Sequence, residues 1–140
     1  MAMEISILGF NLTKILGSKN PSFKGNLEIT NSINISSIEK HEVNFLKEDI
    51  LKIDFSFKVT YKDFAEILLE GFSLLKIDPK NFKEVLKEWK DKKLNNEFQT
   101  IVLNLIMQKC SIRAIELEEE LGLPIHIRLP SLKVEKKDNS

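Results

Sequence analysis

Side chains that commonly take part in catalysis or metal binding are few and widely separated in this sequence. His41 and His126 are the two histidines, and neither has a second histidine three or four positions away. His41-Glu42 begins like the metal-binding helix of a zinc peptidase, but Phe45 stands where the second histidine is required. We therefore predict no metal site.

Cys110, the single cysteine, is the best candidate for a nucleophile, with His126 as its base. Cys110 falls within a predicted helix among apolar neighbours, where burial keeps a thiol protonated and unreactive. The 5 glycines are dispersed along the chain, so no glycine-rich loop could hold a phosphate. No pair of carboxylates is distinguished for acid–base chemistry. We predict no catalytic residue and no cofactor, and we expect that the protein is not an enzyme.

Length and composition restrict the class of protein. The 140 residues suit one domain, which we place at residues 1–134, followed by a disordered tail at residues 135–140. Hydrophobic residues make up 42% of the chain, enough for a core, and 21 basic residues balance 21 acidic ones. Because the net charge is zero, the electrostatic attraction that drives generic nucleic-acid binding is missing. We expect no nucleic-acid partner.

The sequence carries no signal for export or membrane insertion. No apolar run reaches the ~18–20 residues that cross a bilayer, and the first residues lack the basic region of a signal peptide. A chain with one cysteine can form no internal disulfide, which favours a reducing compartment. We expect a cytoplasmic protein that does not insert into membranes.

Alternation of apolar and polar residues predicts strands in the first half of the chain. Apolar residues occupy every second position of Leu27–Ile35, apart from Asn31, and of Asp49–Tyr61. This period excludes an amphipathic helix. Lys40–Asn44, between these two segments, is polar and is predicted as a connection.

Two further segments are apolar on both faces. Glu4–Leu16 is predicted as a strand, followed by a loop over Gly17–Gly25 that is rich in Gly, Ser, Asn and Pro. Phe64–Ile77 follows a tight hairpin and is predicted as a strand that is covered on both faces or meets a partner. If Phe64, Phe72 and Leu74 point away from the helices, they form an exposed apolar platform, a common mark of a binding surface.

The period changes to that of helices after residue 77. Asp78-Pro79 is a favourable helix start, with an N-cap carboxylate before a proline. Asn96 with Gln99 resembles a capping box that opens a second, longer helix, which ends at Gly122. The sequence therefore predicts four strands followed by a short and a long helix on one side of the sheet.

The second helix is too long and too apolar for so small a domain to cover alone. At 1.5 Å per residue, a helix of about 25 residues is roughly 38 Å long, more than the expected diameter of the domain. Its first half is apolar nearly all round. We predict that it packs against another subunit through Phe98, Ile101, Val102, Leu105 and Ile106.

Acidic residues crowd the C-terminal turns of this helix, where they oppose the helix dipole. They are Glu116, Glu118, Glu119 and Glu120. Two interpretations remain open. Either the acids form a solvated helix end, partly offset by Arg113, or they form an acidic docking patch for a partner.

The order of the elements and three local segments resemble the SecB chaperone family. Phe64–Ser73 resembles the family's fourth strand, an acidic and apolar run into glycine, an aromatic residue and serine. Cys110–Pro124 is similar to its long helix, where an arginine precedes a Gly-Phe-Pro break. Leu123–Leu132 resembles its proline-marked ending, with Leu123-Pro124 and Leu129-Pro130 in the matching places. The resemblance covers residues 4–134.

This resemblance implies an α+β fold with a four-stranded antiparallel sheet followed by a short and a long helix packed on one face. It also implies an ATP-independent holdase, active in protein transport. Members of the family form homotetramers, dimers of dimers, and hold unfolded or precursor polypeptides in apolar grooves. By position, the groove of this chain would be lined by residues of the fourth strand, the short helix and the C-terminal arm. They are Phe72, Leu74, Leu75, Phe82, Leu86, Trp89, Ile125, Ile127 and Leu129.

The neutral charge departs from the family's strongly acidic bacterial members, whose acidic sheet face docks the SecA motor. Lys52 and Lys58 occupy outward strand positions here, which argues against delivery to SecA. A dedicated client such as an antitoxin is one alternative. Another is a protein of a different class, a small α+β adaptor or scaffold with one specific partner. A holdase should suppress the aggregation of unrelated unfolded proteins, whereas an adaptor should ignore them.

Overall fold

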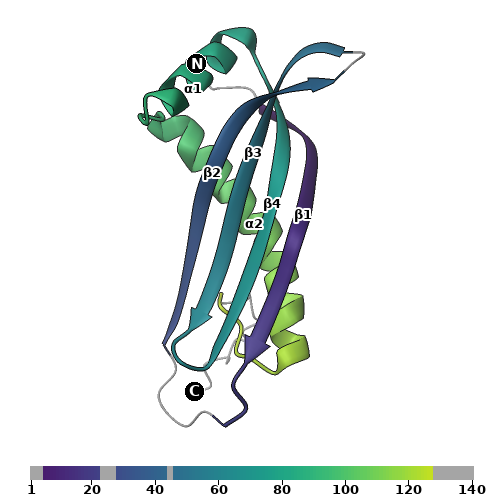
Figure 1. Cartoon of the computed structure of the whole chain (residues 1–140), viewed down its shortest axis with the longest axis vertical. Coiled ribbons are helices and arrows are strands. Elements are labelled where there is room, and N and C mark those ends of the chain that lie inside the picture. Colours follow the sequence, from purple (N-terminus) through teal and green to yellow (C-terminus); the bar gives the residue numbers. More distant parts are fainter. Residues whose placement is uncertain (1–4, 23–27, 44–45, 128–140) are drawn as a thin grey trace, which may run out of the picture.

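Four long strands followed by two helices make up the computed structural model, which describes residues 5–22, 28–43 and 46–127 (Figure 1). Strands come first along the chain and helices last, as predicted. The elements are β1 (Ile5–Lys19), β2 (Ile29–Val43), β3 (Leu46–Tyr61), β4 (Ala65–Ile77), α1 (Pro79–Lys90) and α2 (Asn96–Leu121). The predicted tail at residues 135–140 lies outside the described residues.

The four strands form one antiparallel sheet in the order β1-β4-β3-β2, so β1 and β2 lie at its two edges. Helix α2 crosses one face of the sheet diagonally and contacts all four strands (Figure 1). Helix α1 packs at one end of the sheet, against β2 and β3. This arrangement confirms the predicted fold class.

Strict alternation along β3 and β4 separates a core face from an outer face. On β4, Ile67, Leu69 and Leu75 are completely buried beneath the helices, and the residues that alternate with this buried set, such as Leu68, Phe72 and Leu74, are half-buried. The inward residues predicted for the central strand β3 are all at most 2% exposed, which confirms that prediction. They are Leu51, Ile53, Phe55, Phe57, Val59 and Tyr61.

Two segments predicted as connections belong to strands. β2 continues through Lys40 to Val43, and β1 continues through Gly17 to Lys19. The predicted connection is therefore wrong over Lys40–Val43, and the predicted loop begins at Asn20 rather than at Gly17. The reason is that strand pairing is made by backbone N–H and C=O groups, whatever side chains they carry. The register also shifts within β1 and β2, which interrupts the period of two along these strands.

The helix ends are capped by polar side chains and glycine. Asp78 caps α1, and the hydrogen bonds that its carboxylate accepts from Asn81 lower the pKa of Asp78 below its usual value. The cap of α2 is Asn95, one residue before the predicted Asn96, and its Oδ1 accepts a first-turn backbone N–H at 2.8 Å. Gly122 adopts a left-handed φ of 66°, which confirms the predicted end of the helix.

Helix α2 is no longer than the sheet that carries it, contrary to the premise of the predicted subunit contact. A strand of 15 residues spans roughly 50 Å, and a helix of 26 residues spans roughly 39 Å. Of the residues predicted for the interface, Phe98, Val102 and Ile106 lie buried in the chain's own core, and Ile101 and Leu105 are half-buried. Neither described helix is long and apolar enough to cross a membrane.

Candidate functional site

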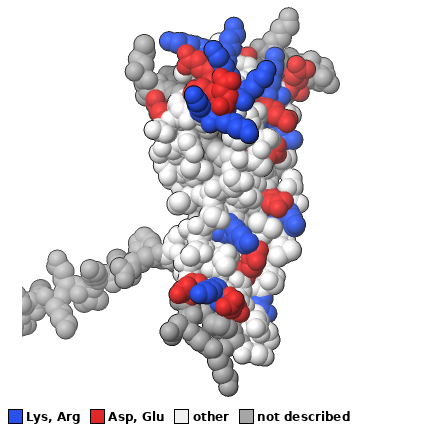
Figure 2. Space-filling view, turned by 60° about the vertical axis from the view of Figure 1, so that its left-hand side comes forward, with Lys and Arg blue, Asp and Glu red and all other residues white. Residues whose placement is uncertain are grey.

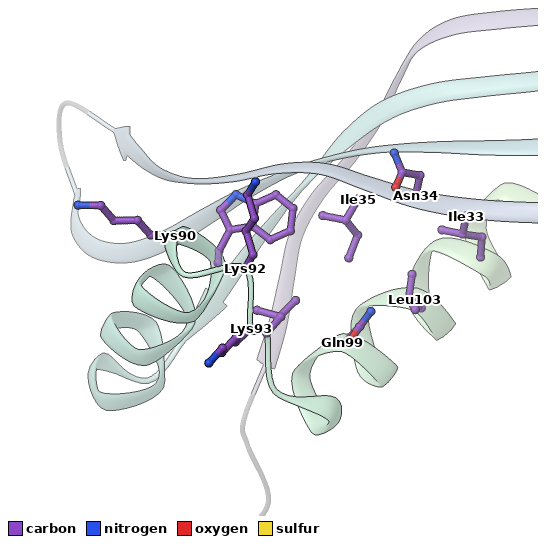
Figure 3. Close-up of a pocket in the computed structure, with 10 residues that line it drawn as sticks. Ile33, Asn34, Ile35, Lys90, Lys92, Lys93, Gln99 and Leu103 are labelled. Carbon is purple, nitrogen blue, oxygen red and sulfur yellow. The ribbon is translucent and has the colours of Figure 1, made fainter.

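A hollow of about 740 Å³ opens between the edge strand β2, the end of α1 and the start of α2 (Figure 3). Its walls combine aliphatic and aromatic side chains with a group of lysines and two amides. The lining residues are Ile33, Asn34, Ile35, Trp89, Lys90, Lys92, Lys93, Leu94, Gln99 and Leu103. The volume is sufficient for several amino-acid side chains and falls within the usual range of ligand sites.

The apolar wall of the hollow is made by two elements that face each other. Ile33 and Ile35 lie on the helix-facing side of β2, because their register partners Phe57 and Phe55 are core residues. Leu103 projects toward them from α2 (Figure 3). All three side chains that form this wall are only half-buried, so the chain leaves apolar surface uncovered here.

The basic side of the hollow is made by the turn that joins the two helices. Lys92 adopts a left-handed φ of 59°, and its backbone N–H donates to the Trp89 carbonyl at 3.0 Å. This tight turn brings Lys90, Lys92 and Lys93 to the α1 end of the hollow, away from Ile33 (Figure 3). Figure 2 shows charged side chains gathered at the end of the molecule that carries α1, above a broad uncharged region.

The hollow lies beside a free strand edge. In the described sheet β2 pairs only with β3, so the backbone groups on its other side have no strand partner. Such an edge can accept an additional strand from another chain. Apolar side chains and free backbone groups therefore occur together at Ile33–Ile35.

The residues predicted to line a groove do not gather at one place. Trp89 lines the hollow, and Leu86 lies half-buried against the core from the same helix. Leu75 and Phe82 are core residues, with 0% and 5% of their surface exposed. The wall residues on β2 and α2 were not predicted as site residues, although the alternation along β2 had marked Ile33 and Ile35 as half-buried.

Phe72 and Leu74 point away from the helices, as their register partners on β3 show. They pair with Asp54 and Lys52, residues of the outer face. Both are half-buried, and the Lys52 ammonium lies 4.9 Å from the centre of the Phe72 ring. These two residues therefore occupy an outer surface on the side of the sheet opposite the hollow.

The predicted arm residues lie at the other end of the molecule. Ile125 and Ile127 are half-buried on either side of His126, which follows the end of α2. Leu129 lies outside the described residues. Hydrogen bonds from His126 to α2 hold this segment against the helix.

Glu118 is the centre of a buried polar cluster at this end. Its side chain is completely buried and accepts hydrogen bonds from the His126 Nδ1 at 2.8 Å, the His126 backbone N–H at 3.0 Å and the Tyr61 hydroxyl. Burial, followed by the hydrogen bond and the charge of Glu118, raises the pKa of Tyr61 well above its usual value. The interpretation of this acid as part of a solvated helix end or docking patch is therefore wrong for Glu118, which joins β3, α2 and the C-terminal segment.

The cluster contains a serine, a histidine and a carboxylate arranged as in a hydrolase triad, but a substrate cannot reach them. Ser111 Oγ lies 3.1 Å from the His126 Nε2, and Glu118 holds the opposite ring nitrogen. However, Ser111 is 6% exposed and the His126 side chain has no exposed surface, so a substrate carbonyl has no approach to the hydroxyl. Burial also raises the pKa of the Cys110 thiol to about 12, which keeps it protonated at neutral pH. We interpret the cluster as structural.

Comparison with known proteins identifies the fold. No protein-family model and no curated protein matches this sequence. The chain is similar in structure to a SecB-like chaperone of Mycobacterium tuberculosis, solved in complex with a ChAD peptide from the HigA1 antitoxin. The TM-score is 0.54, with 93% of this chain and 91% of that chain covered, and the sequence identity is 11%. The protein therefore has the fold of a SecB-like chaperone.

Proposed function

We propose that this protein is an ATP-independent chaperone that holds unfolded polypeptides, and that the hollow between β2, α1 and α2 is its binding groove. The observation that carries the proposal is an apolar hollow of about 740 Å³ beside a free strand edge. The hollow accepts apolar side chains, and the edge bonds to backbone groups. Together they suit clients of varied sequence, because neither interaction depends on one particular side chain.

The energy of such binding comes from apolar surface removed from water. A client segment that buries roughly 300 Å² of apolar surface gains on the order of 7 kcal/mol, before the cost of ordering the segment. Hydrogen bonds to the edge of β2 add affinity that does not depend on sequence. The complex needs no nucleotide in this scheme, because release follows when the client folds and buries its own apolar residues.

The similar structure supports a polypeptide as the ligand class. That SecB-like chaperone was solved with an antitoxin peptide, and this chain shares its fold over nearly its whole length. An antitoxin is accordingly one client class, and a precursor protein is another. We further propose that the protein works in the cytoplasm and does no chemistry on its client.

We also propose that the chain assembles with copies of itself through β1. This edge strand exposes Ile7, Leu8, Ile15 and Leu16, each more than 40% exposed, beside backbone groups with no strand partner in the described sheet. Pairing of β1 with β1 of a second copy would cover these side chains and extend the sheet. A dimer of dimers is the assembly that we propose.

Suppression of aggregation tests the chaperone function. A reduced, denatured model protein that aggregates on dilution is mixed with increasing amounts of the protein, and light scattering is recorded. We expect suppression at near-stoichiometric amounts for several unrelated model proteins. An adaptor with one specific partner would leave all of them to aggregate, and that result would overturn the proposal.

A pair of matched variants tests the position of the groove. Leu103→Gln removes apolar surface from the hollow, and Ile115→Gln makes the same kind of change at a half-buried position of α2 outside it. We expect Leu103→Gln to weaken suppression severalfold and Ile115→Gln to leave it unchanged, with both variants folded by circular dichroism. Equal effects of the two substitutions would place client binding elsewhere.

A further inference from the structure

The groove has two chemically different ends. Ile33 and Leu103 lie at one end, and the last residue of α1, Lys90, lies at the other, with Lys92 and Lys93 of the turn that follows it (Figure 3). None of the described residues that line this hollow is acidic. A client held there would meet an apolar surface over part of its length and positive charge over the rest.

The three lysines are available to a ligand. All three are exposed, and within the described residues none of their ammonium groups lies within ion-pair distance of a carboxylate. The acidic residues nearest to these lysines in sequence, Glu88 and Asp91, do not line this hollow. Glu88 accepts three hydrogen bonds from Asn95, and Asp91 lines a neighbouring hollow. Lys93 borders both hollows, whereas Lys90 and Lys92 line only the groove.

We infer that the groove selects polypeptide segments in which an apolar stretch is flanked on one side by acidic residues. The inference rests on the proposed function, because it concerns the sequence preference of the same groove. Apolar client side chains occupy the Ile33–Leu103 end, and client carboxylates lie among the lysines of the turn. Long, flexible lysine side chains can reach carboxylates at several positions. The preference is therefore for negative charge on one side of the apolar stretch, not for one fixed sequence motif.

Peptides that differ only in their flanks test this preference. Each carries the same tryptophan-free apolar stretch and a fluorescein label, and the residues on one side are Glu, Gln or Lys. Dissociation constants are measured by fluorescence anisotropy at low and high salt. At low salt we expect the Glu peptide to bind about tenfold more tightly than the Gln peptide and the Lys peptide to bind most weakly, with the difference reduced at high salt.

The possible outcomes separate this inference from the proposed function. Equal binding of all three peptides, or a preference for the Lys peptide, would overturn the inference and leave polypeptide binding intact. Absence of binding by every peptide and by a longer unfolded chain would overturn the proposed function itself. A peptide with Glu residues on the opposite side should bind no better than the Gln peptide.

Charge-matched variants locate the preference on the protein. In one variant Lys90→Gln and Lys93→Gln are combined with Lys92→Asn, because asparagine tolerates the left-handed conformation at position 92. The control carries glutamine at three exposed lysines outside the groove, Lys80, Lys83 and Lys109. We expect the first variant to bind the Glu and Gln peptides equally and the control to keep the preference. Loss of the preference in both would assign it to net charge and overturn the inference.

Discussion

At the scale of single residues, Glu118 shows what local sequence conceals. Glu118, Glu119 and Glu120 are chemically identical neighbours, yet only Glu118 is buried and bonded to Tyr61 and His126. The difference depends on which side of α2 meets the sheet and on where the chain returns after Gly122. Neither is encoded in the local acidic run, so sequence reasoning could not separate the three residues.

The cluster predicts an abnormal titration of Tyr61, the single tyrosine of the chain. Its pKa is raised in the folded state, whereas an unfolded tyrosine ionises near pH 10. The cluster therefore stabilises the fold below about pH 10, and this stability is lost as the pH rises further. Absorbance at 295 nm measures tyrosinate directly. We expect ionisation only together with unfolding, and a reversible native titration near pH 10 would contradict the described cluster.

Close contact between β1 and β4 predicts that Gly71 is required. A Cβ atom at Gly71 would stand 2.1 Å from the carbonyl oxygen of Asn11, a separation that no side-chain movement relieves. Gly9 is a matched control, since a Cβ there would have its nearest contact at 3.7 Å. We expect Gly71→Ala to lower the free energy of unfolding by about 1–3 kcal/mol in denaturant titrations and Gly9→Ala to have little effect. Equal stability of the two variants would contradict the register of β1.

At the scale of elements, the connection between α1 and α2 is held by hydrogen bonds between two residues that lie seven positions apart, Glu88 and Asn95. Glu88 near the end of α1 accepts hydrogen bonds from the backbone and side chain of Asn95 at 2.9–3.2 Å. Asn95 in turn caps α2 through its Oδ1. The contact fixes the turn that carries the lysines, and so it shapes the basic end of the groove.

This contact predicts unequal effects at two adjacent asparagines. Asn95→Ala removes the cap and the partner of Glu88, and we expect it to lower the free energy of unfolding by about 1 kcal/mol. Asn96→Ala, at an exposed first-turn position, should stay within about 0.5 kcal/mol of the wild type. Urea titration measures both. A larger effect at Asn96 would contradict Asn95 as the N-cap and favour Asn96, the cap predicted from the sequence.

Much of the fold could be predicted from the local sequence pattern, whereas the groove could be predicted only in part. The alternation of β3 identified its core face, and Asp78 and Gly122 marked helix ends, because these features depend on adjacent residues. The sheet order depends on pairing between distant segments, so the pattern could not place β2 at an edge. Trp89 was therefore predicted for the groove without its partners Ile33 and Leu103.

At the scale of the whole molecule, a long sheet crossed by one diagonal helix leaves surface uncovered on both flanks. On the flank of β2 this surface forms the hollow, and on the flank of β1 it consists of exposed side chains such as Leu8 and Ile15. Both flanks end in a free strand edge within the described sheet. We assign the β2 flank to clients and the β1 flank to a second copy of the chain.

Assembly through β1 predicts a defined mass in solution. Multi-angle light scattering of the wild type should give a multiple of the 16.2 kDa chain, two or four copies. Leu8→Lys combined with Ile15→Lys introduces charge on the exposed edge and should lower the mass to that of a smaller species. Thr100→Lys, at an exposed position of α2 away from β1, is the control and should not. A monodisperse wild-type monomer would contradict the proposed assembly.

Polypeptide binding in the hollow is tested most directly through Trp89, the single tryptophan of the chain and a lining residue of the hollow. An unfolded client without tryptophan is titrated into the protein while the emission of Trp89 is recorded. We predict a saturable shift of the emission to shorter wavelength, as the client displaces water from the indole, and a weaker response in Leu103→Gln. Unchanged Trp89 emission at concentrations where anisotropy of a labelled client reports complete binding would contradict the account.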